Sequence, residues 1–540
     1  MSHIINNNWN AKSAWLATAA LAAMLSMFYV APVRAAAPGI TGTSFNFSAE
    51  ANRISQPDGA SVYSWGYGCR TAPAGFAPAA IAGATCPSMQ IPGPTLIVHQ
   101  GDQVTVTLTN NLPAAAGNTS ILFPGFQVCA AVMNPDGSCP AAPTGVPGLL
   151  TREAAHGGSV TYSFIASTAG THNYYSGTQG DLQIEMGLYG AIIVLPTAVP
   201  AGCRAVASTL PDGQTDYRNA AAAYNHAASC YDREYLFQFS EMDPRIHSQA
   251  EDQAGAACTQ PGGCMAVDTE PYHPAYFMIN GRSMPDDMDP NYAVQYPHQP
   301  YNGNPHMHPG ELVLLRIIGA GRWQHPFHEH GNHVRILGRD GNLILSQTDA
   351  TKLAGPLLFT TTTTPGLAMD GIFYWTGKGL NWDVYGHSAG GLYTDAAFPA
   401  YLGKPVVCIP DANGYYTADP LAPNYYEWCQ DHNKPLEAHP FGAVGSGGPV
   451  TLPDANILTN GSWYGGSPYL GPDATTRAVG PTGSTPPSGT IANSPTGEAG
   501  FAFMWHSHNE REITTNNIFP GGMMMMMLVD PQAYLINEAN

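Results

Sequence analysis

The chain has 540 residues, of which 44% are apolar, so it is long enough to bury at least two cores. Only 11% of the residues are charged, and 39 acidic residues against 20 basic ones give a net charge of -19. This balance argues against nucleic acid and anionic membranes as partners and favours cations. Glycine and proline are frequent, but runs of Val, Ile, Thr and Tyr lie between them, which predicts an all-β protein with long loops.

The N-terminal residues predict an export signal. Lys12 precedes an apolar run at 14–31, and small residues around Ala35 offer a cleavage site. The run is short and ends at Pro32, so we expect residues 1–35 to be a cleaved signal peptide and not a membrane anchor. No later stretch is long and apolar enough to span a bilayer. The sequence therefore predicts an extracytoplasmic protein (periplasmic, at the cell surface or secreted) without a membrane span after cleavage.

The cysteine count fits export as well. An even number of cysteines in an oxidising compartment predicts disulfide bonds, and metal thiolates are the alternative. The ten cysteines fall in couples that are near in sequence: Cys69/Cys86, Cys129/Cys139, Cys203/Cys230, Cys258/Cys264 and Cys408/Cys429. None of them lies near the histidine pairs described below, which favours disulfides.

Short strands separated by Gly and Pro turns are predicted from about residue 40 to residue 198. Residues 93–108, for example, alternate between apolar and polar side chains around a Gly-Asp turn. Several such strands in succession predict a sandwich or barrel. The segment that follows, 199–231, is rich in Ala, Asp and Asn and is expected to be a linker.

A second β unit is predicted over residues 232–531. Its expected strands are 235–239, 276–280, 311–318, 357–360, 371–375, 500–505 and 523–529. A loop insertion rich in Gly, Pro, Tyr and Asn interrupts it at about 380–499, and loops of this length are functional lids or disordered segments. The two units repeat one another, because the residues around His308 match those around His99.

Two histidine pairs end apolar runs of the second unit. They are His325-Pro-Phe-His328-Glu-His330-Gly331 and Trp505-His506-Ser507-His508. Side chains at i and i+2 of a strand point to the same face, so two such strands side by side would gather four imidazoles. Copper, zinc and nickel prefer this ligand type. The alternative to metal binding is that the histidines are hydrogen-bonded in a core or on a surface. Four clustered rings without a metal would, however, need many hydrogen-bond partners.

Structural roles are expected for several neighbouring residues. Glu329 should point away from the histidines, as a surface or supporting group, and His333 should also face away. His306 and His308 are expected to form a loop pair before a Pro-Gly turn. The methionine run 523–527 is expected to be a closing strand, in preference to a soft Cu(I) site.

These motifs together resemble those of the multicopper oxidases. Residues 325–331 are similar to the family's HPxHxHG motif, and residues 506–512 resemble HCHxxxH. Residues 119–125 and 173–177 occupy the places of SIHxHG and WYHSH. Similarity to a bacterial branch that includes proteins implicated in manganese oxidation extends over 373–377, 505–510 and 519–523. The resemblance implies two cupredoxin-like Greek-key β-barrel domains, at 40–198 and at 232–531.

The chain departs from the family at the mononuclear blue copper. The resemblance would make His325 a ligand of that ion, beside a cysteine and a second histidine. Ser507 and Glu512 occupy those two positions. A blue site needs a thiolate, which a serine hydroxyl does not replace.

It also departs at the trinuclear cluster, for which the family supplies eight histidines. The first unit has Leu122, Pro124, Tyr175 and Gly177 at four of those positions. The resemblance therefore implies one or two copper ions, with zinc as the alternative, held by His328, His330, His506 and His508. His325 and Glu512 are candidate further ligands, and no catalytic residue is assigned.

Two functions remain open from the sequence. One is an exported, copper-binding, multicopper-oxidase-like oxidoreductase that acts on metal ions or small phenols through a reduced, histidine-only copper site. The other is a non-catalytic copper-binding protein for sequestration or surface assembly. A structural module with a vestigial site is a third hypothesis, and fold resemblance alone does not choose among them.

Overall fold

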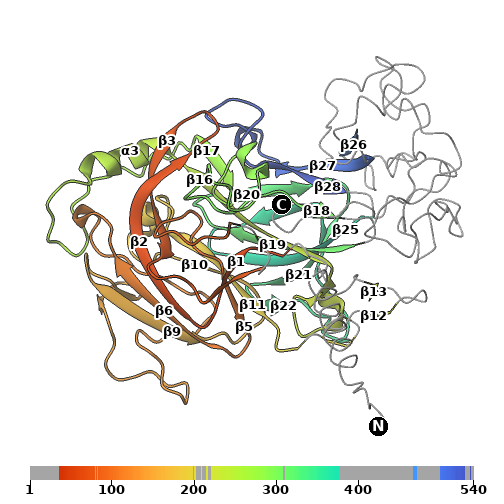
Figure 1. Cartoon of the computed structure of the whole chain (residues 1–540), viewed down its shortest axis with the longest axis horizontal. Coiled ribbons are helices and arrows are strands. Elements are labelled where there is room, and N and C mark those ends of the chain that lie inside the picture. Colours follow the sequence, from red (N-terminus) through yellow and green to blue (C-terminus); the bar gives the residue numbers. More distant parts are fainter. Residues whose placement is uncertain are drawn as a thin grey trace, which may run out of the picture. The chain divides into compact units, whose positions relative to one another are not determined.

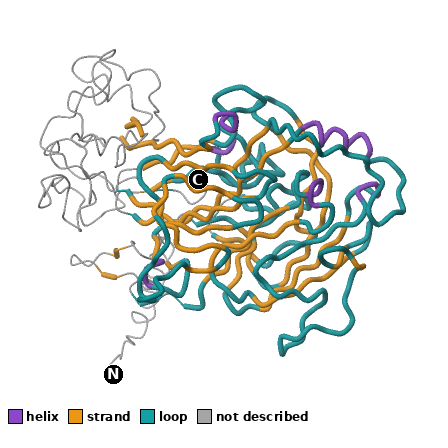
Figure 2. The backbone as a smooth tube through the Cα atoms, turned by 180° about the vertical axis from the view of Figure 1, so that it is seen from behind, coloured by secondary structure: helices purple, strands orange, loops and turns teal. Residues whose placement is uncertain are grey.

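Two pairs of β-sheets form the framework of the chain. The computed structural model describes residues 36–375 and 499–529, strand 466–470 and residue 536, with gaps at 79–80, 82, 199, 202, 204–207, 210–214, 217–220 and 308–310. These residues all belong to one compact unit, Ala35–Asn540. Strands are the main regular structure of the described backbone, and the helices are short segments (Figures 1 and 2). The predicted all-β class is confirmed.

The first pair of sheets lies between residues 39 and 195. One sheet has the order β10 (Gly170–Tyr175), β11 (Tyr189–Leu195), β5 (Leu96–His99), β1 (Gly39–Thr41) and β4 (Gly75–Ala77). The other has the order β3 (Ser61–Cys69), β2 (Ser44–Ser55), β6 (Gln103–Asn110) and β9 (Ser159–Ile165). Alternate side chains of β6 are buried, as expected for a strand with one face on a core. Side chains from both sheets share that core, among them Phe45, Val106, Leu96 and Ile192.

The second pair lies between residues 233 and 529. One sheet has the order β17 (Tyr276–Ile279), β16 (Arg233–Met242), β19 (Leu312–Gly319), β25 (Ala368–Tyr374), β21 (Val334–Arg339) and β22 (Asn342–Leu343), and β23 (Leu357–Leu358) also pairs with β21. The other has the order β18 (His306–Met307), β28 (Met524–Val529), β27 (Ala499–Ser507), β20 (His325–Glu329) and β24 (Thr360–Thr363), and β26 (Gly466–Leu470) also pairs with β27. Figure 1 shows β20, β27 and β28 running side by side.

The second pair repeats the strand order of the first. Strands β17-β16-β19-β25 have the order and directions of β3-β2-β6-β9, including the parallel central pairing. Strands β27-β28-β18 likewise repeat β10-β11-β5. Such a repeat places the residues around Leu122 and Tyr175 of the first pair where the histidines lie in the second.

The remaining elements are short. The hairpin β7 (Val146–Pro147) with β8 (Arg152–Glu153) belongs to the first pair of sheets, and β12 (Ser208–Thr209), β13 (Thr215–Asp216), β14 (Ala221–Ala222) and β15 (Cys230–Tyr231) lie in the expected linker. The helices are α2 (Gly180–Gln183), α3 (Pro244–Gln253) and the 3₁₀ turns η1 (Ala114–Ala116), η2 (Ala227–Ser229), η3 (Asp286–Met288) and η4 (Glu510–Ile513). Helix α3 was not predicted from the sequence. Asp243 caps it by accepting a hydrogen bond from the backbone N–H of Arg245.

The core of the second pair lies directly behind the histidine strands. Trp505 is fully buried and meets Phe327 and Phe373 edge-on, and burial of such a side chain contributes about 1.5–3 kcal/mol. Met525 and Met527 of β28 fill the same core. The closing-strand interpretation of the methionine run is thus confirmed. The loop expected at His306 is wrong, because His306–Met307 forms β18, which pairs in parallel with β28. His308, the other member of that pair, lies outside the described residues.

Four of the five predicted disulfides are confirmed: Cys69–Cys86, Cys129–Cys139, Cys203–Cys230 and Cys258–Cys264. Cys408 and Cys429 lie outside the described residues, as do the expected signal peptide and most of the insertion. Within the described part of the chain, no helix has the length and apolar character needed to cross a membrane.

Candidate metal centre

The structure brings His328, His330, His506 and His508 together. Strands β20 and β27 pair antiparallel, with His328 directly opposite His506. The ring centroid of His328 lies 4.6 Å from that of His330, 4.9 Å from that of His508 and 5.7 Å from that of His506. His506 lies 5.2 Å from His330 and 5.4 Å from His508. The alternation of two neighbouring strands is sufficient to produce this four-histidine cluster.

The turn that ends β20 depends on glycine. Gly331 follows His330 with a φ of 103°, which side chains other than hydrogen rarely tolerate. A Cβ there would also lie 2.9 Å from the ring of Phe503. The indole N–H of Trp505 donates to the carbonyl of His330 at 2.9 Å. The glycine and this hydrogen bond hold the end of the strand, and with it the His330 ring, against β27.

Hydrogen bonds orient two of the four rings, and that of His506 leaves its Nε2 directed at His330. His506 Nδ1 donates to the carbonyl of Ser507 at 2.7 Å, so the lone pair of this neutral ring resides on Nε2. His328 Nδ1 lies 2.8 Å from the hydroxyl of Thr360 on β24. Outer partners of this kind fix the orientation of histidines that bind metal.

Burial favours the neutral form of His328 and His506. Desolvation, followed by the proximity of His330, His508 and His506, lowers the pKa of His328 to about 4. Burial also lowers the pKa of His506. His508, by contrast, is exposed, so the cluster has one ring at the surface. Neutral imidazoles carry the lone pairs that a metal requires.

The donor set fits a metal ion, although only two of the four rings have the spacing of ligands to one ion. His330 Nε2 and His506 Nε2 lie 3.2 Å apart. Two nitrogens bound to one tetrahedral ion at about 2.0–2.1 Å would lie about 3.3 Å apart. Among the described residues, however, no three His, Cys, Asp or Glu side chains already form a metal-holding group. The His330–His506 pair is therefore the preformed part of the cluster, and the other two rings would have to turn towards an ion.

The hydroxyl of Thr360 provides a test of this arrangement. Thr360→Val keeps the shape of the side chain and removes the partner of His328 Nδ1, so we expect copper affinity to fall by roughly 10–100-fold. Competition with a chelator measures the change. The matched control is Thr362→Val, at an exposed position of the same strand. Equal losses in both variants would contradict the role of Thr360.

His325 and Glu512, the two further candidate ligands, lie in a separate buried network. His325 Nδ1 is 2.8 Å from Glu512 Oε2, and His325 Nε2 is 2.9 Å from Glu241 Oε2. Burial alone would lower the pKa of His325, but the hydrogen bonds and charges of the two carboxylates outweigh it and raise the pKa to about 9. A protonated imidazole has no lone pair. These residues therefore do not fit a blue copper ion.

Glu512 joins the two strands that carry the histidine pairs. Its Oε2 accepts hydrogen bonds from His325 on β20 and from the hydroxyl of Ser507 on β27. Its Oε1 accepts from Asn509 Nδ2 at 2.9 Å. Ser507 lies between His506 and His508, so a single buried carboxylate ties both histidine-bearing strands together.

Glu241, the second carboxylate on His325, was not predicted from the sequence. It lies at the end of β16, fully enclosed, and accepts hydrogen bonds from the backbone N–H groups of Arg322 (2.7 Å) and Trp323 (2.8 Å). The sequence does contain a signal for its burial. Glu241 lies two and four residues after Phe239 and Phe237 on one strand, so its side chain points to the same face as these core residues. A carboxylate on that face needs a buried partner.

Glu329 is also more buried than expected. Its side chain is fully enclosed and accepts a hydrogen bond from Thr361, and burial raises its pKa to about 8. The surface alternative for Glu329 is therefore wrong. His333 is partly buried, and its ring packs against Phe359 with a centroid distance of 5.2 Å.

The first pair of sheets has apolar packing at the equivalent position. Leu122 and Tyr175 form an antiparallel bridge, as His328 and His506 do in the second pair. A Cβ on Gly177 would lie 2.8 Å from Leu122 Cγ, so the small residue permits this close packing. Neither a leucine nor a glycine can coordinate an ion.

Comparison with known proteins gives a partial match. Residues 84–198 match the family model "Multicopper oxidase". "Multicopper oxidase MCE" of Talaromyces pinophilus is 34% identical over 107 residues, which cover 20% of this chain and 15% of that protein. "Laccase abr2" of Aspergillus fumigatus is 36% identical over 107 residues, covering 20% of this chain and 16% of that protein. The matched stretch thus spans about a sixth of these relatives, and the family match does not include the four histidines.

Solved structures that align with the chain share little sequence with it. "Multicopper Oxidase mgLAC" aligns with a TM-score of 0.44 and 15% identity, covering 92% of this chain and 88% of that one. The blue copper oxidase from Nitrosomonas europaea aligns with a TM-score of 0.42 and 17% identity, covering 90% and 85%.

Proposed function

We propose that the chain is an exported copper protein with a histidine-only site, and the match of residues 84–198 to the multicopper oxidase family model supports the choice of copper. His328, His330, His506 and His508 hold one or two copper ions. The blue copper of the family is absent, because a protonated histidine, a serine and two carboxylates occupy its position. The observation that carries the proposal is the convergence of four imidazoles, in which each ring centroid lies within 5.7 Å of at least two others.

The donor set favours copper over zinc. Nitrogen-rich sites suit Cu(II), which has the highest affinity among the common divalent ions, and zinc is the alternative. Copper, when bound, supplies one-electron redox chemistry. The chain's own residues orient the rings through Thr360 and the Ser507 carbonyl, and exposed His508 leaves one ligand accessible from solvent.

We propose an oxidoreductase that acts on metal ions or small phenols. The alternative is a binding protein that sequesters copper or contributes to surface assembly without turnover. Four disulfide bonds support an oxidising compartment outside the cytoplasm. The similarity to bacterial proteins implicated in manganese oxidation makes Mn(II) a substrate to be tested first.

Copper stoichiometry and colour test the site. We expect elemental analysis of copper-loaded protein to give one or two ions per chain, without the strong absorption of a blue copper. Three or four ions with strong blue colour would overturn the proposed site. Oxygen uptake with Mn(II), Fe(II), Cu(I) or a phenol then separates the oxidoreductase from the binding protein.

A further inference from the structure

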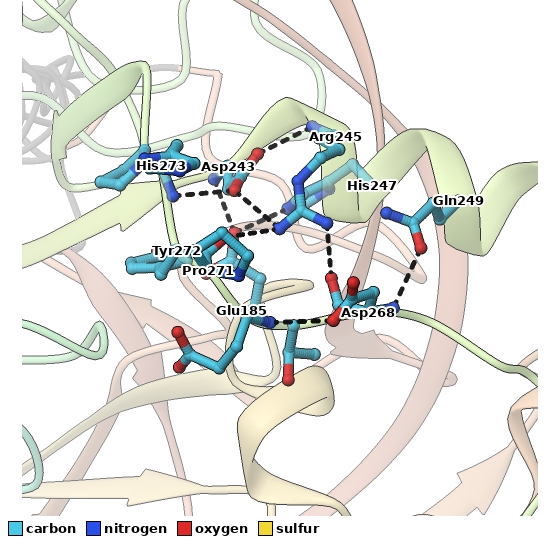
Figure 3. Close-up of polar contacts among 12 residues, drawn as sticks. Glu185, Asp243, Arg245, His247, Gln249, Asp268, Pro271, Tyr272 and His273 are labelled. Carbon is cyan, nitrogen blue, oxygen red and sulfur yellow. Dashed lines mark hydrogen bonds and ion pairs between the residues drawn. The ribbon is translucent and has the colours of Figure 1, made fainter.

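A buried tyrosine lies between two carboxylates on the far side of His325. The hydroxyl of Tyr272 donates to Glu185 Oε2 at 2.6 Å, and Glu241 Oε1 lies 3.4 Å away. Both carboxylates are buried, and Tyr272 is itself only 9% exposed. Figure 3 shows Tyr272 and Glu185 beside Asp243 and Arg245, at the start of α3. A phenol in this position has a proton acceptor already in hydrogen-bond contact.

Glu185 is free to act as that acceptor. Its other oxygen accepts the backbone N–H of Asp243 at 2.6 Å, and His247 Nε2 is 3.7 Å from it. Tyr224 offers a contrast, since its hydroxyl donates to Asp370, which pairs with the guanidinium of Arg316. A carboxylate neutralised by arginine is a weak base. Glu185 lacks an arginine partner among the described residues, and burial raises its pKa.

An aromatic partner connects Tyr272 with the surface. The ring of Trp323 meets Tyr272 edge-on at 5.3 Å and is 36% exposed. The guanidinium of Arg322 lies 4.1 Å from the centre of the Tyr272 ring on its face. The backbone N–H of Trp323 donates to Glu241 Oε1. Two oxidisable rings therefore run from the protein surface to the buried carboxylates.

The path continues towards the four-histidine cluster. Glu241 Oε2 is 2.9 Å from His325 Nε2, and His325 begins the strand that carries His328. Hydrogen bonds and three peptide units thus join the phenol of Tyr272 to the cluster. In this chain the Cys-to-His connection expected of the family is missing, because Ser507 stands in place of the cysteine.

We propose that Tyr272, together with Trp323, is a one-electron redox site through which electrons pass from a reduced substrate at the surface to the four-histidine cluster. The inference rests on the proposed function for its physiological oxidant, Cu(II) held by the four histidines. On oxidation of Tyr272 one electron leaves to Cu(II), which becomes Cu(I), and the O–H bond breaks as its proton passes to Glu185 Oε2. A reduced metal ion, or a phenol that releases its own proton to solvent, then supplies one electron at the surface near Trp323, and Glu185 returns its proton to the phenoxyl oxygen of Tyr272.

Oxidation of the copper-free protein by a flash-generated ruthenium(III) polypyridyl complex tests the site without relying on copper. We expect a tyrosyl radical signal in electron paramagnetic resonance that falls at least tenfold in Tyr272→Phe. The matched control is Tyr189→Phe, a buried tyrosine whose hydroxyl donates to Ser240. It should leave the signal unchanged. Glu185→Gln, which keeps the shape but removes the base, should lower the radical yield, and Trp323→Phe should slow radical formation.

A full-sized radical signal in Tyr272→Phe would overturn the proposal. So would equal losses in Tyr272→Phe and Tyr189→Phe. Copper-loaded protein provides the second arm, in which Tyr272→Phe should slow reduction of the copper by substrate at unchanged copper content. If the radical forms at Tyr272 but wild-type protein binds no copper, the proposed function fails and the tyrosine site stands.

Discussion

Replacing His328 and His506 together with alanine is expected to abolish copper binding. The two residues are directly opposite on β20 and β27 and come from different histidine pairs. Their loss leaves one imidazole of each histidine pair, and the preformed contact between His330 and His506 disappears. Because loss of an outer partner alone costs about 10–100-fold in metal affinity, removal of two ligands should cost roughly 100-fold or more. Elemental analysis after copper loading and dialysis measures the occupancy.

The matched control for this experiment is His333→Ala. His333 lies three residues beyond His330, packs against Phe359 and belongs to neither pair. Its replacement should leave copper occupancy at the wild-type level. Full occupancy in the doubly substituted chain would place the metal elsewhere, whereas equal losses in both variants would indicate a general effect on folding. Circular dichroism of each copper-free variant checks the fold.

The convergence of the histidines could be predicted because it depends on local rules. The period of two along a strand determines that His328 and His330 share a face, and the same rule applies to His506 and His508. That the two strands are neighbours followed from the internal repeat and the family motifs. The neighbouring cysteine couples made four disulfides predictable for a similar reason, since each bridge closes a short loop.

The partners of His325 could not be predicted, because they depend on long-range register. Glu241 is 84 residues away in sequence and Glu512 is 187 residues away. Their positions follow from how β16 and η4 pack against β20, which the pattern of a single strand does not contain. Family resemblance also misled here, because it offered His325 and Glu512 as ligands. Glu241, which together with Glu512 keeps His325 protonated, lies outside every family motif.

The buried position of His325 makes stability depend on pH. Its pKa is about 9 in the folded chain, against an ordinary value of 6.5. Because the folded pKa is the higher one, the ion pairs stabilise the protein fully below about pH 6.5. This contribution decreases as pH rises through about 9. Chemical denaturation should therefore give a lower free energy of unfolding at pH 9.5 than at pH 6.

His325→Leu removes the cation and leaves Glu241 and Glu512 buried with their charges uncompensated. Breaking a buried ion pair in this way costs about 3–5 kcal/mol, so we expect a loss of that size at pH 6 and a smaller loss at pH 9.5. His325→Leu combined with Glu241→Gln and Glu512→Gln removes the uncompensated charges and should recover part of the stability. If His325→Leu kept the wild-type difference between pH 6 and pH 9.5, another group would be responsible. A metal ion at His325 would produce the opposite pattern, because raising the pH frees an imidazole for coordination and so would stabilise the metal-bound chain.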